Sequence, residues 1–167
     1  MIKWLLFLSV CFPTLLLAQP ENTEPPYKRF PSLPPMQLLL GDSVSKFTKQ
    51  DLPKKKAVLV MLFSPDCSHC QHTAEELPKF TKALKDVQVV MATVHSISQM
   101  NEFVRKYGLD KLPNVVVGKD LYFLLPPFYA VKNFPFLAFY NKKGALISVF
   151  EGSMPLEKVA DVFKEAR

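Results

Sequence analysis

Apolar residues follow two patterns along the chain. Residues 57–63 and 87–94 are almost continuously apolar, which predicts strands that are covered on both faces of a sheet. In residues 67–85, 98–107 and 154–166, apolar side chains recur at helical spacing, which predicts helices with one buried face. The order strand, helix, strand is typical of a parallel crossover unit. The chain is therefore predicted to fold as an α/β domain with a central mixed sheet flanked by helices.

Turn residues and prolines refine this picture. Pro78 lies inside the first helical pattern and should kink or divide that helix. Apolar runs around short turns predict two β-hairpins, at residues 36–48 and 134–150, the first of them an N-terminal extension of the sheet. The remaining segments are expected to form a short strand, at residues 112–118, and a helical turn with an irregular loop, at residues 121–133.

The first residues have the layout of an export signal. Lys3 precedes a hydrophobic stretch that runs to Leu17, and Ala18 stands before polar residues. The stretch is short for a membrane span, so we expect residues 1–18 to be cleaved as a signal peptide and the mature protein to be periplasmic or secreted. A retained signal that anchors the protein in the membrane is the alternative.

Proline is concentrated after this segment. Five of the 15 prolines lie between residues 21 and 35, in a stretch with little apolar surface to bury. Residues 19–35 are therefore expected to be a linker or a strap laid over the domain, and the domain should span residues 36–167.

The charge balance argues against nucleic-acid binding. Lys and Arg outnumber Asp and Glu by 21 to 15, but the basic residues are spread along the chain. A nucleic-acid interface needs basic side chains gathered on one face. Nucleic acid is therefore not expected as a partner.

Two cysteines follow the first apolar run directly. Cys67 and Cys70 stand after a Ser-Pro-Asp turn, where the first helical pattern begins. The free N–H groups and the dipole of a helix N-terminus stabilise a thiolate, and C-x-x-C cysteines titrate at roughly pH 3.5–7.5 instead of about 8.5. Signal cleavage would remove Cys11 and leave only this pair. A structural disulfide across so short a loop removes little chain entropy, which favours a redox role.

The order of these features resembles a thioredoxin fold. The first hairpin is similar to that of exported thioredoxin-like proteins of the TlpA and ResA type, which are tied to cytochrome maturation and cell-envelope redox chemistry. Phe134-Pro135 looks like the start of that family's cis-proline strand, and Glu151-Gly152 resembles its closing glycine. The resemblance covers residues 35–167 and implies a thiol–disulfide oxidoreductase without a cofactor or a metal.

The resemblance also implies roles for individual residues. Cys67 looks like the exposed attacking cysteine and Cys70 like the buried resolving cysteine, so both are expected to be catalytic. Their places at the open end of the helix and one turn inside it support this assignment. Phe134 and Pro135 would dock an extended substrate chain beside the dithiol.

Two charged or titratable neighbours are expected to modulate Cys67. His69 lies between the cysteines, where a partly charged imidazole favours a thiolate, whereas the carboxylate of Asp66 disfavours it. Disulfide isomerases carry a His at this place and many reductases carry a Pro. His69 therefore argues for a more oxidising couple.

The chain departs from the family at the positions that transfer protons. Thioredoxins keep a buried acid six residues before the first cysteine, where this chain has Met61. The TlpA and ResA type often keeps a Glu three residues after the second cysteine, where this chain has Thr73. Glu75 and Glu76 lie nearby, but exposed helix carboxylates are the simpler interpretation of both.

Two other functions use the same fold. His69 and His72 lie close in sequence to the cysteines, as a copper chaperone would require, but such chaperones typically space their cysteines one residue wider. His95 is expected to be an ordinary loop or core-edge histidine. The other candidate is a non-catalytic binding protein, whose surface would be formed by aromatic residues, namely Tyr122, Phe123, Phe128 and Tyr129.

We therefore expect an exported oxidoreductase that reduces disulfides of cell-envelope proteins, in cytochrome maturation or in general redox homeostasis. Its electrons would come from a membrane thiol–disulfide donor. A disulfide oxidase or isomerase stays open as the alternative, because the choice of reduction follows from the resemblance alone.

Overall fold

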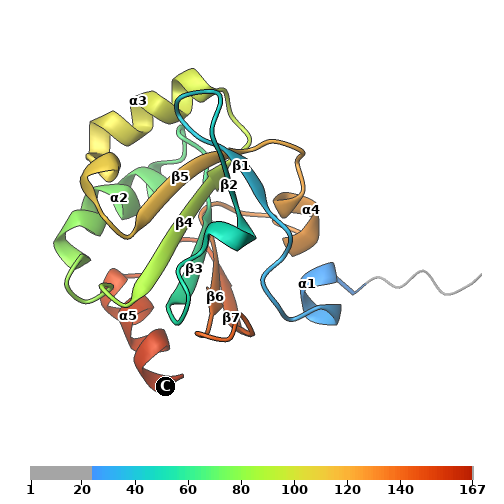
Figure 1. The fold of residues 1–167 in the computed structure, drawn as a ribbon. Coiled ribbons are helices and arrows are strands. Elements are labelled where there is room, and N and C mark those ends of the chain that lie inside the picture. Colours follow the sequence, from blue (N-terminus) through green and yellow to red (C-terminus); the bar gives the residue numbers. More distant parts are fainter. Residues whose placement is uncertain (1–23, 167) are drawn as a thin grey trace, which may run out of the picture.

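The computed structural model describes residues 24–166, so the predicted signal peptide at residues 1–18 lies outside the described part. These residues form one seven-stranded sheet with helices on both faces (Figure 1). The predicted α/β class is confirmed.

The sheet is mixed, and its strand order is β2-β1-β5-β4-β3-β6-β7. β3, β4 and β5 are parallel to one another, whereas all other neighbouring strands are antiparallel. The strands are β1 (Gln37–Leu39), β2 (Lys46–Thr48), β3 (Ala57–Leu62), β4 (Val87–Thr93), β5 (Val115–Asp120), β6 (Phe136–Tyr140) and β7 (Leu146–Glu151). The registers confirm both predicted hairpins, and the first one joins the sheet through β1 and β5.

Residues 24–166 also form five α-helices and three 3-10 helices. They are α1 (Pro26–Arg29), η1 (Lys49–Asp51), α2 (Ser68–Glu76), η2 (Leu77–Phe80), α3 (Ile97–Tyr107), η3 (Leu109–Lys111), α4 (Leu125–Tyr129) and α5 (Leu156–Glu165). No helix between residues 24 and 166 is long and apolar enough to cross a membrane.

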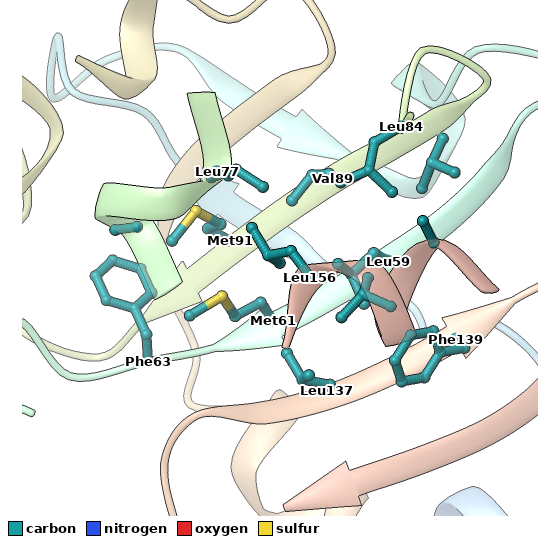
Figure 2. Close-up of a cluster of buried hydrophobic side chains, with 14 of the residues drawn as sticks. Leu59, Met61, Phe63, Leu77, Leu84, Val89, Met91, Leu137, Phe139 and Leu156 are labelled. Carbon is teal, nitrogen blue, oxygen red and sulfur yellow. The ribbon is translucent and has the colours of Figure 1, made fainter. Parts of the chain in front are cut away.

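The central strands are buried on both faces because two apolar cores lie on opposite sides of the sheet. Leu59 and Met61 of β3 face one core, which α2, α3 and α5 cover (Figure 2). Val58 and Val60 alternate with them and face the other core, which α4 covers. This double coverage explains the continuous apolar pattern of residues 57–63.

The helix after β3 is shorter than predicted. α2 ends at Glu76, and the chain continues as the 3-10 helix η2 and then as turns. Pro78 has no N–H group to donate to the preceding turn, and its ring crowds the carbonyl four residues back. The prediction that Pro78 divides the helix is therefore confirmed, but the predicted extent of helix to residue 85 is wrong.

The short strand predicted at residues 112–118 begins and ends later, at Val115 and Asp120. A turn at residues 113–114 precedes it, closed by the Val115 N–H and the Leu112 carbonyl at 3.1 Å. The buried Asn114 side chain holds this turn, because its amide donates to the carbonyl oxygens of Leu84 and Val87, at 2.8 and 3.0 Å. The loop that follows contains the helical turn α4, as predicted.

The Pro-rich segment lies against the core that α4 covers, which is called the second core below. The ring of Tyr27 in α1 is 6.1 Å from that of Tyr129, and Leu33 is buried. Ser32 forms an isolated bridge with Ala145 at the end of the sheet. Residues 24–35 therefore run over the domain as a strap.

Candidate active site

The turn after β3 places Cys67 at the N-cap of α2. The Cys67 N–H donates to the carbonyl of Ser64 at 3.2 Å, and the Cys67 carbonyl accepts from Gln71 at 2.9 Å. The sulfur itself accepts the backbone N–H of Cys70, with 3.2 Å between N and Sγ. The thiol thus occupies the place that a Ser or Asp side chain takes in other helices. A negative charge on this half-buried sulfur would face the positive end of the helix.

Cys70 lies one turn inside the same helix and is fully buried, with none of its surface exposed. Burial raises the pKa of the Cys70 thiol, and its hydrogen bond with Cys67 adds to the rise. A backbone hydrogen bond from Ser64 acts in the opposite direction and lowers this pKa. The two cysteines therefore stand in unlike environments, one open and one protected.

The second wall of the site comes from the segment before β6. The peptide bond between Phe134 and Pro135 is cis. The Cys67 thiol donates to the Phe134 carbonyl oxygen, with 3.6 Å between Sγ and O. β6 pairs with β3, so Phe136 lies opposite Leu62 at the end from which the dithiol turn begins. The structure thus brings Cys67 and the predicted docking pair together across 67 residues of sequence.

The two expected modulators, His69 and Asp66, flank Cys67 and are exposed. The His69 carbonyl accepts the hydroxyl of Thr73 at 2.9 Å, so the backbone of His69 is held within α2 while its ring faces solvent. The Asp66 N–H donates to the Ser64 hydroxyl at 3.4 Å. Their modulating roles stay predictions.

The positions considered for proton transfer hold no buried acid. Met61 is part of the core, and Thr73 is buried against the backbone. Glu75 is exposed, and Glu76 pairs with Lys79 at 2.6 Å on the surface. The hydrogen bond from Lys79 lowers the pKa of Glu76. This arrangement favours the surface interpretation of both carboxylates.

Among residues 24–166, no three His, Cys, Asp or Glu side chains are grouped so that they could hold a metal ion. His69 and His72 are exposed, whereas Cys70 is buried. His95 was expected to be an ordinary loop or core-edge residue, yet its Nε2 lies 3.1 Å from the hydroxyl oxygen of Ser64. A signal for this contact exists in the sequence, since both residues follow parallel strands whose carboxyl ends meet at one sheet edge.

The four aromatic residues that would form the surface of a non-catalytic binding protein do not lie on one surface. Tyr129 is buried, and its hydroxyl lies 2.7 Å from that of Tyr140. Phe128 is half-buried against the second core. Tyr122 and Phe123 are each 58% exposed. The proposed binding surface thus shrinks to the loop between β5 and α4.

A dithiol that caps a helix, faces a cis-proline and lies at the end of a mixed sheet defines a thioredoxin-fold protein. A family model described as Thioredoxin matches residues 41–121. The chain therefore has a thioredoxin fold, and residues 41–121 are similar to the thioredoxin family.

Solved structures show the same fold. A secreted Mycobacterium tuberculosis disulfide oxidoreductase, homologous to E. coli DsbE, is 20% identical with a TM-score of 0.63, over 75% of this chain and 92% of that one. StoA from Bacillus subtilis is 16% identical with a TM-score of 0.61, over 79% and 98%. The exposed lipoprotein thioredoxin Etrx1 from Streptococcus pneumoniae is 24% identical with a TM-score of 0.62, over 79% and 99%. A comparison with curated proteins gave no match.

Proposed function

We propose that the protein is an exported thiol–disulfide oxidoreductase of the TlpA and ResA type, which reduces disulfides in proteins of the cell envelope. One observation carries the oxidoreductase role. The Cys67 sulfur caps α2, lies 3.6 Å from the Phe134 carbonyl oxygen and stands above the buried Cys70. This is the arrangement that disulfide exchange needs: an accessible nucleophile, a resolving thiol and a backbone edge for the substrate.

The exchange takes place in two steps. The Cys67 thiolate attacks one sulfur of a substrate disulfide, which forms a mixed disulfide and releases the other substrate sulfur as a thiolate. Cys70 then loses its proton and attacks the Cys67 sulfur, which forms the Cys67–Cys70 disulfide and releases the second substrate thiolate. The substrate gains two electrons, and both released thiolates can take up protons. A dithiol donor must then return two electrons to the protein.

The unlike environments of the cysteines set this order. Burial raises the pKa of Cys70, so the buried sulfur is a thiol while the outer sulfur attacks. Once the mixed disulfide has formed on Cys67, the substrate covers the site and Cys70 is the thiol next to it. The hydrogen bond from the Ser64 backbone supports the ionised form of Cys70 during this second attack.

Export and the envelope partners are supported by the sequence and by the neighbours. The Lys3 region and the apolar stretch that follows it have the layout of a signal. One structural neighbour is described as secreted and another as an exposed lipoprotein. A membrane thiol–disulfide protein is the donor that such a location offers.

The direction of electron flow is tested by the reduction potential of the Cys67–Cys70 couple. Equilibration with glutathione or dithiothreitol at pH 7, followed by mass measurement of alkylated protein, gives this potential. A value near that of thioredoxin, about −270 mV, supports the reductase, whereas a value of about −180 mV or higher points to the oxidase or isomerase that His69 favours.

The exchange itself is tested with two matched substitutions. Cys70→Ser should hold the mixed disulfide with a protein substrate, because the resolving sulfur is gone, and Cys67→Ser should give no such adduct. If both variants reduce insulin as well as the unchanged protein does, the dithiol is not the reactive group.

A further inference from the structure

A side-chain bridge joins the ends of the two central parallel strands beside the dithiol. The last link of the backbone ladder between β3 and β4 runs from the Phe63 N–H to the Ala92 carbonyl, at 3.0 Å. Beyond this bond the segment after β3 leads to α2, and the segment after β4 leads to α3. There Ser64 Oγ and His95 Nε2 lie 3.1 Å apart, so a hydrogen bond between side chains replaces the missing ladder bond.

His95 is held on its own side by two fixed points. Its backbone N–H donates to the hydroxyl of Thr93, at 3.3 Å, and Thr93 is buried in β4. The next residue, Ser96, is the N-cap of α3 and shares a capping box with Gln99. The imidazole is therefore a half-buried group on a short, doubly anchored segment.

Ser64 is the first residue of the turn that carries Cys67. Its hydroxyl oxygen accepts the Asp66 N–H at 3.4 Å, and its carbonyl accepts the Cys67 N–H at 3.2 Å. A backbone hydrogen bond from Ser64 also reaches the Cys70 sulfur and lowers the pKa of that thiol. Because the hydroxyl accepts from Asp66, its own proton is free to be donated to His95 Nε2. Movement of Ser64 therefore changes the surroundings of both cysteines.

We propose that His95 is a positioning residue for the dithiol, which acts through Ser64 to hold the turn at residues 64–66 against the end of β4. The held turn keeps the Cys67 sulfur at the N-cap of α2 and keeps the Ser64 backbone directed at Cys70. The inference deepens the proposed function, since it assigns the support of the same reactive pair. It gives the site a bond between the ends of β3 and β4, where the backbone ladder between these strands stops.

The test compares His95→Ala, Ser64→Ala and the double variant with the unchanged protein. His95→Gln is the conservative variant, because its amide can still bond to the Ser64 hydroxyl. His72→Ala is the matched control, since His72 is also a histidine near Cys70 but is exposed on α2. The measurements are the rate of Cys67 alkylation in the reduced protein at pH 7, the reduction potential of the pair and the thermal midpoint.

His95→Ala and Ser64→Ala should each slow Cys67 alkylation about fivefold, the effect of losing a hydrogen bond worth about 1 kcal/mol. Because the reduced pair loses support, the potential should become more negative by about 20 mV. The double variant should be no worse than either single variant, since both remove the same bond. His95→Gln and His72→Ala should stay close to the unchanged protein.

The proposal is wrong if His95→Ala alkylates at the unchanged rate with an unchanged potential, or if the effects of His95→Ala and Ser64→Ala add. It is also wrong if His95→Gln is as impaired as His95→Ala. Alkylation needs no protein substrate, so these results are separate from the proposed function. An unchanged protein that fails to reduce insulin contradicts the oxidoreductase but not the positioning role. If His95→Ala does not fold, Ser64→Ala breaks the same bond from the other side.

Discussion

Cys67 and Cys70 are three residues apart, yet the fold gives them opposite properties. Cys67 sits where the backbone of α2 leaves its first N–H groups unpaired, and one of these N–H groups points at its sulfur. Cys70 is enclosed by the core, and burial raises the pKa of its thiol. One residue type therefore supplies an accessible thiol and a protected thiol, as the proposed roles of nucleophile and resolving group require.

This difference predicts selective labelling. Iodoacetamide added to the reduced, folded protein at pH 7 should modify Cys67 and leave Cys70 unmodified, because the Cys70 sulfur is both protonated and out of reach. Peptide mass mapping measures both sites, and the same reaction in denaturant is the control, in which both should be labelled. Equal labelling of the two cysteines in the folded protein would contradict the assignment of roles.

A second prediction at this scale concerns Glu76. Its carboxylate is paired with Lys79 at the surface, and Lys79 lowers its pKa, so it is a poor proton carrier for the dithiol at neutral pH. Glu76→Gln should keep the rate of insulin reduction within about twofold, because the carboxylate is not needed as a proton carrier. The lost ion pair with Lys79 should also change the stability little, since exposed ion pairs contribute little to stability. A tenfold loss, with an unchanged thermal midpoint, would instead make Glu76 a proton relay.

The first hairpin shows how one element is fitted to the sheet. β1 pairs with β5 at only two positions, Leu38 with Asp120 and Leu39 with Lys119. Gly118 allows this approach, because a Cβ atom there would lie 2.6 Å from the Leu38 Cβ and 3.3 Å from the Leu39 carbonyl oxygen. A side chain at residue 118 would push the hairpin away from the sheet.

Gly118→Ala should therefore destabilise the protein by about 1–3 kcal/mol, the usual cost of overpacking a closed contact. Urea unfolding followed by circular dichroism measures this free energy. Gly41→Ala is a useful comparison, because the atoms nearest to its Cβ would all belong to the Asn101 side chain, which can rotate away with the loss of one exposed hydrogen bond to the Gly41 carbonyl. A Gly118→Ala protein that unfolds at the same urea concentration as the unchanged protein would show that β1 shifts without cost.

At the scale of the whole molecule, two buried phenols in the second core join α4 to the central sheet. Tyr129 of α4 and Tyr140 of β6 have their hydroxyl oxygens 2.7 Å apart, and the ring of Tyr27 in the strap packs on Tyr129. Burial raises the pKa of Tyr140 to about 12, partly offset by its hydrogen bond with Tyr129. The pKa of Tyr129 is also raised, first by burial and then by Tyr140.

These shifts predict how stability falls at high pH. In the unfolded chain both phenols ionise near the ordinary value of 10.0, whereas the folded state keeps them protonated to higher pH. The unfolded state therefore binds fewer protons above pH 10, and the free energy of unfolding should decrease between about pH 10 and pH 12. The contribution is fully present below pH 10.

Urea unfolding at pH 9, 10 and 11 measures this decrease. The variant Tyr129→Phe with Tyr140→Phe is the control, because it keeps both rings but removes both ionisable groups. The unchanged protein should lose more stability than this variant between pH 10 and pH 11. Parallel curves for the two proteins would mean that other groups cause the loss.

Much of this molecule is determined by short stretches of sequence. The continuous apolar runs specify the buried strands, helical spacing specifies α3 and α5, and Pro78 ends the regular part of α2. The C-x-x-C pair is placed at a helix start by the residues just before it. These features depend on backbone preferences and on which faces are apolar, so neighbours in the sequence are sufficient to define them.

Only the tertiary structure decided what the dithiol faces. Cys67 meets the Phe134 carbonyl and His95 meets Ser64 because strands far apart in sequence end at one edge of the sheet. The burial of Cys70 and the exposure of His69 follow from the way α2 lies on the core. Such contacts join residues 31 to 67 positions apart, and local periodicity holds no information about their pairing. The sequence by itself determined which elements and which thiols exist, and packing decided which groups surround them.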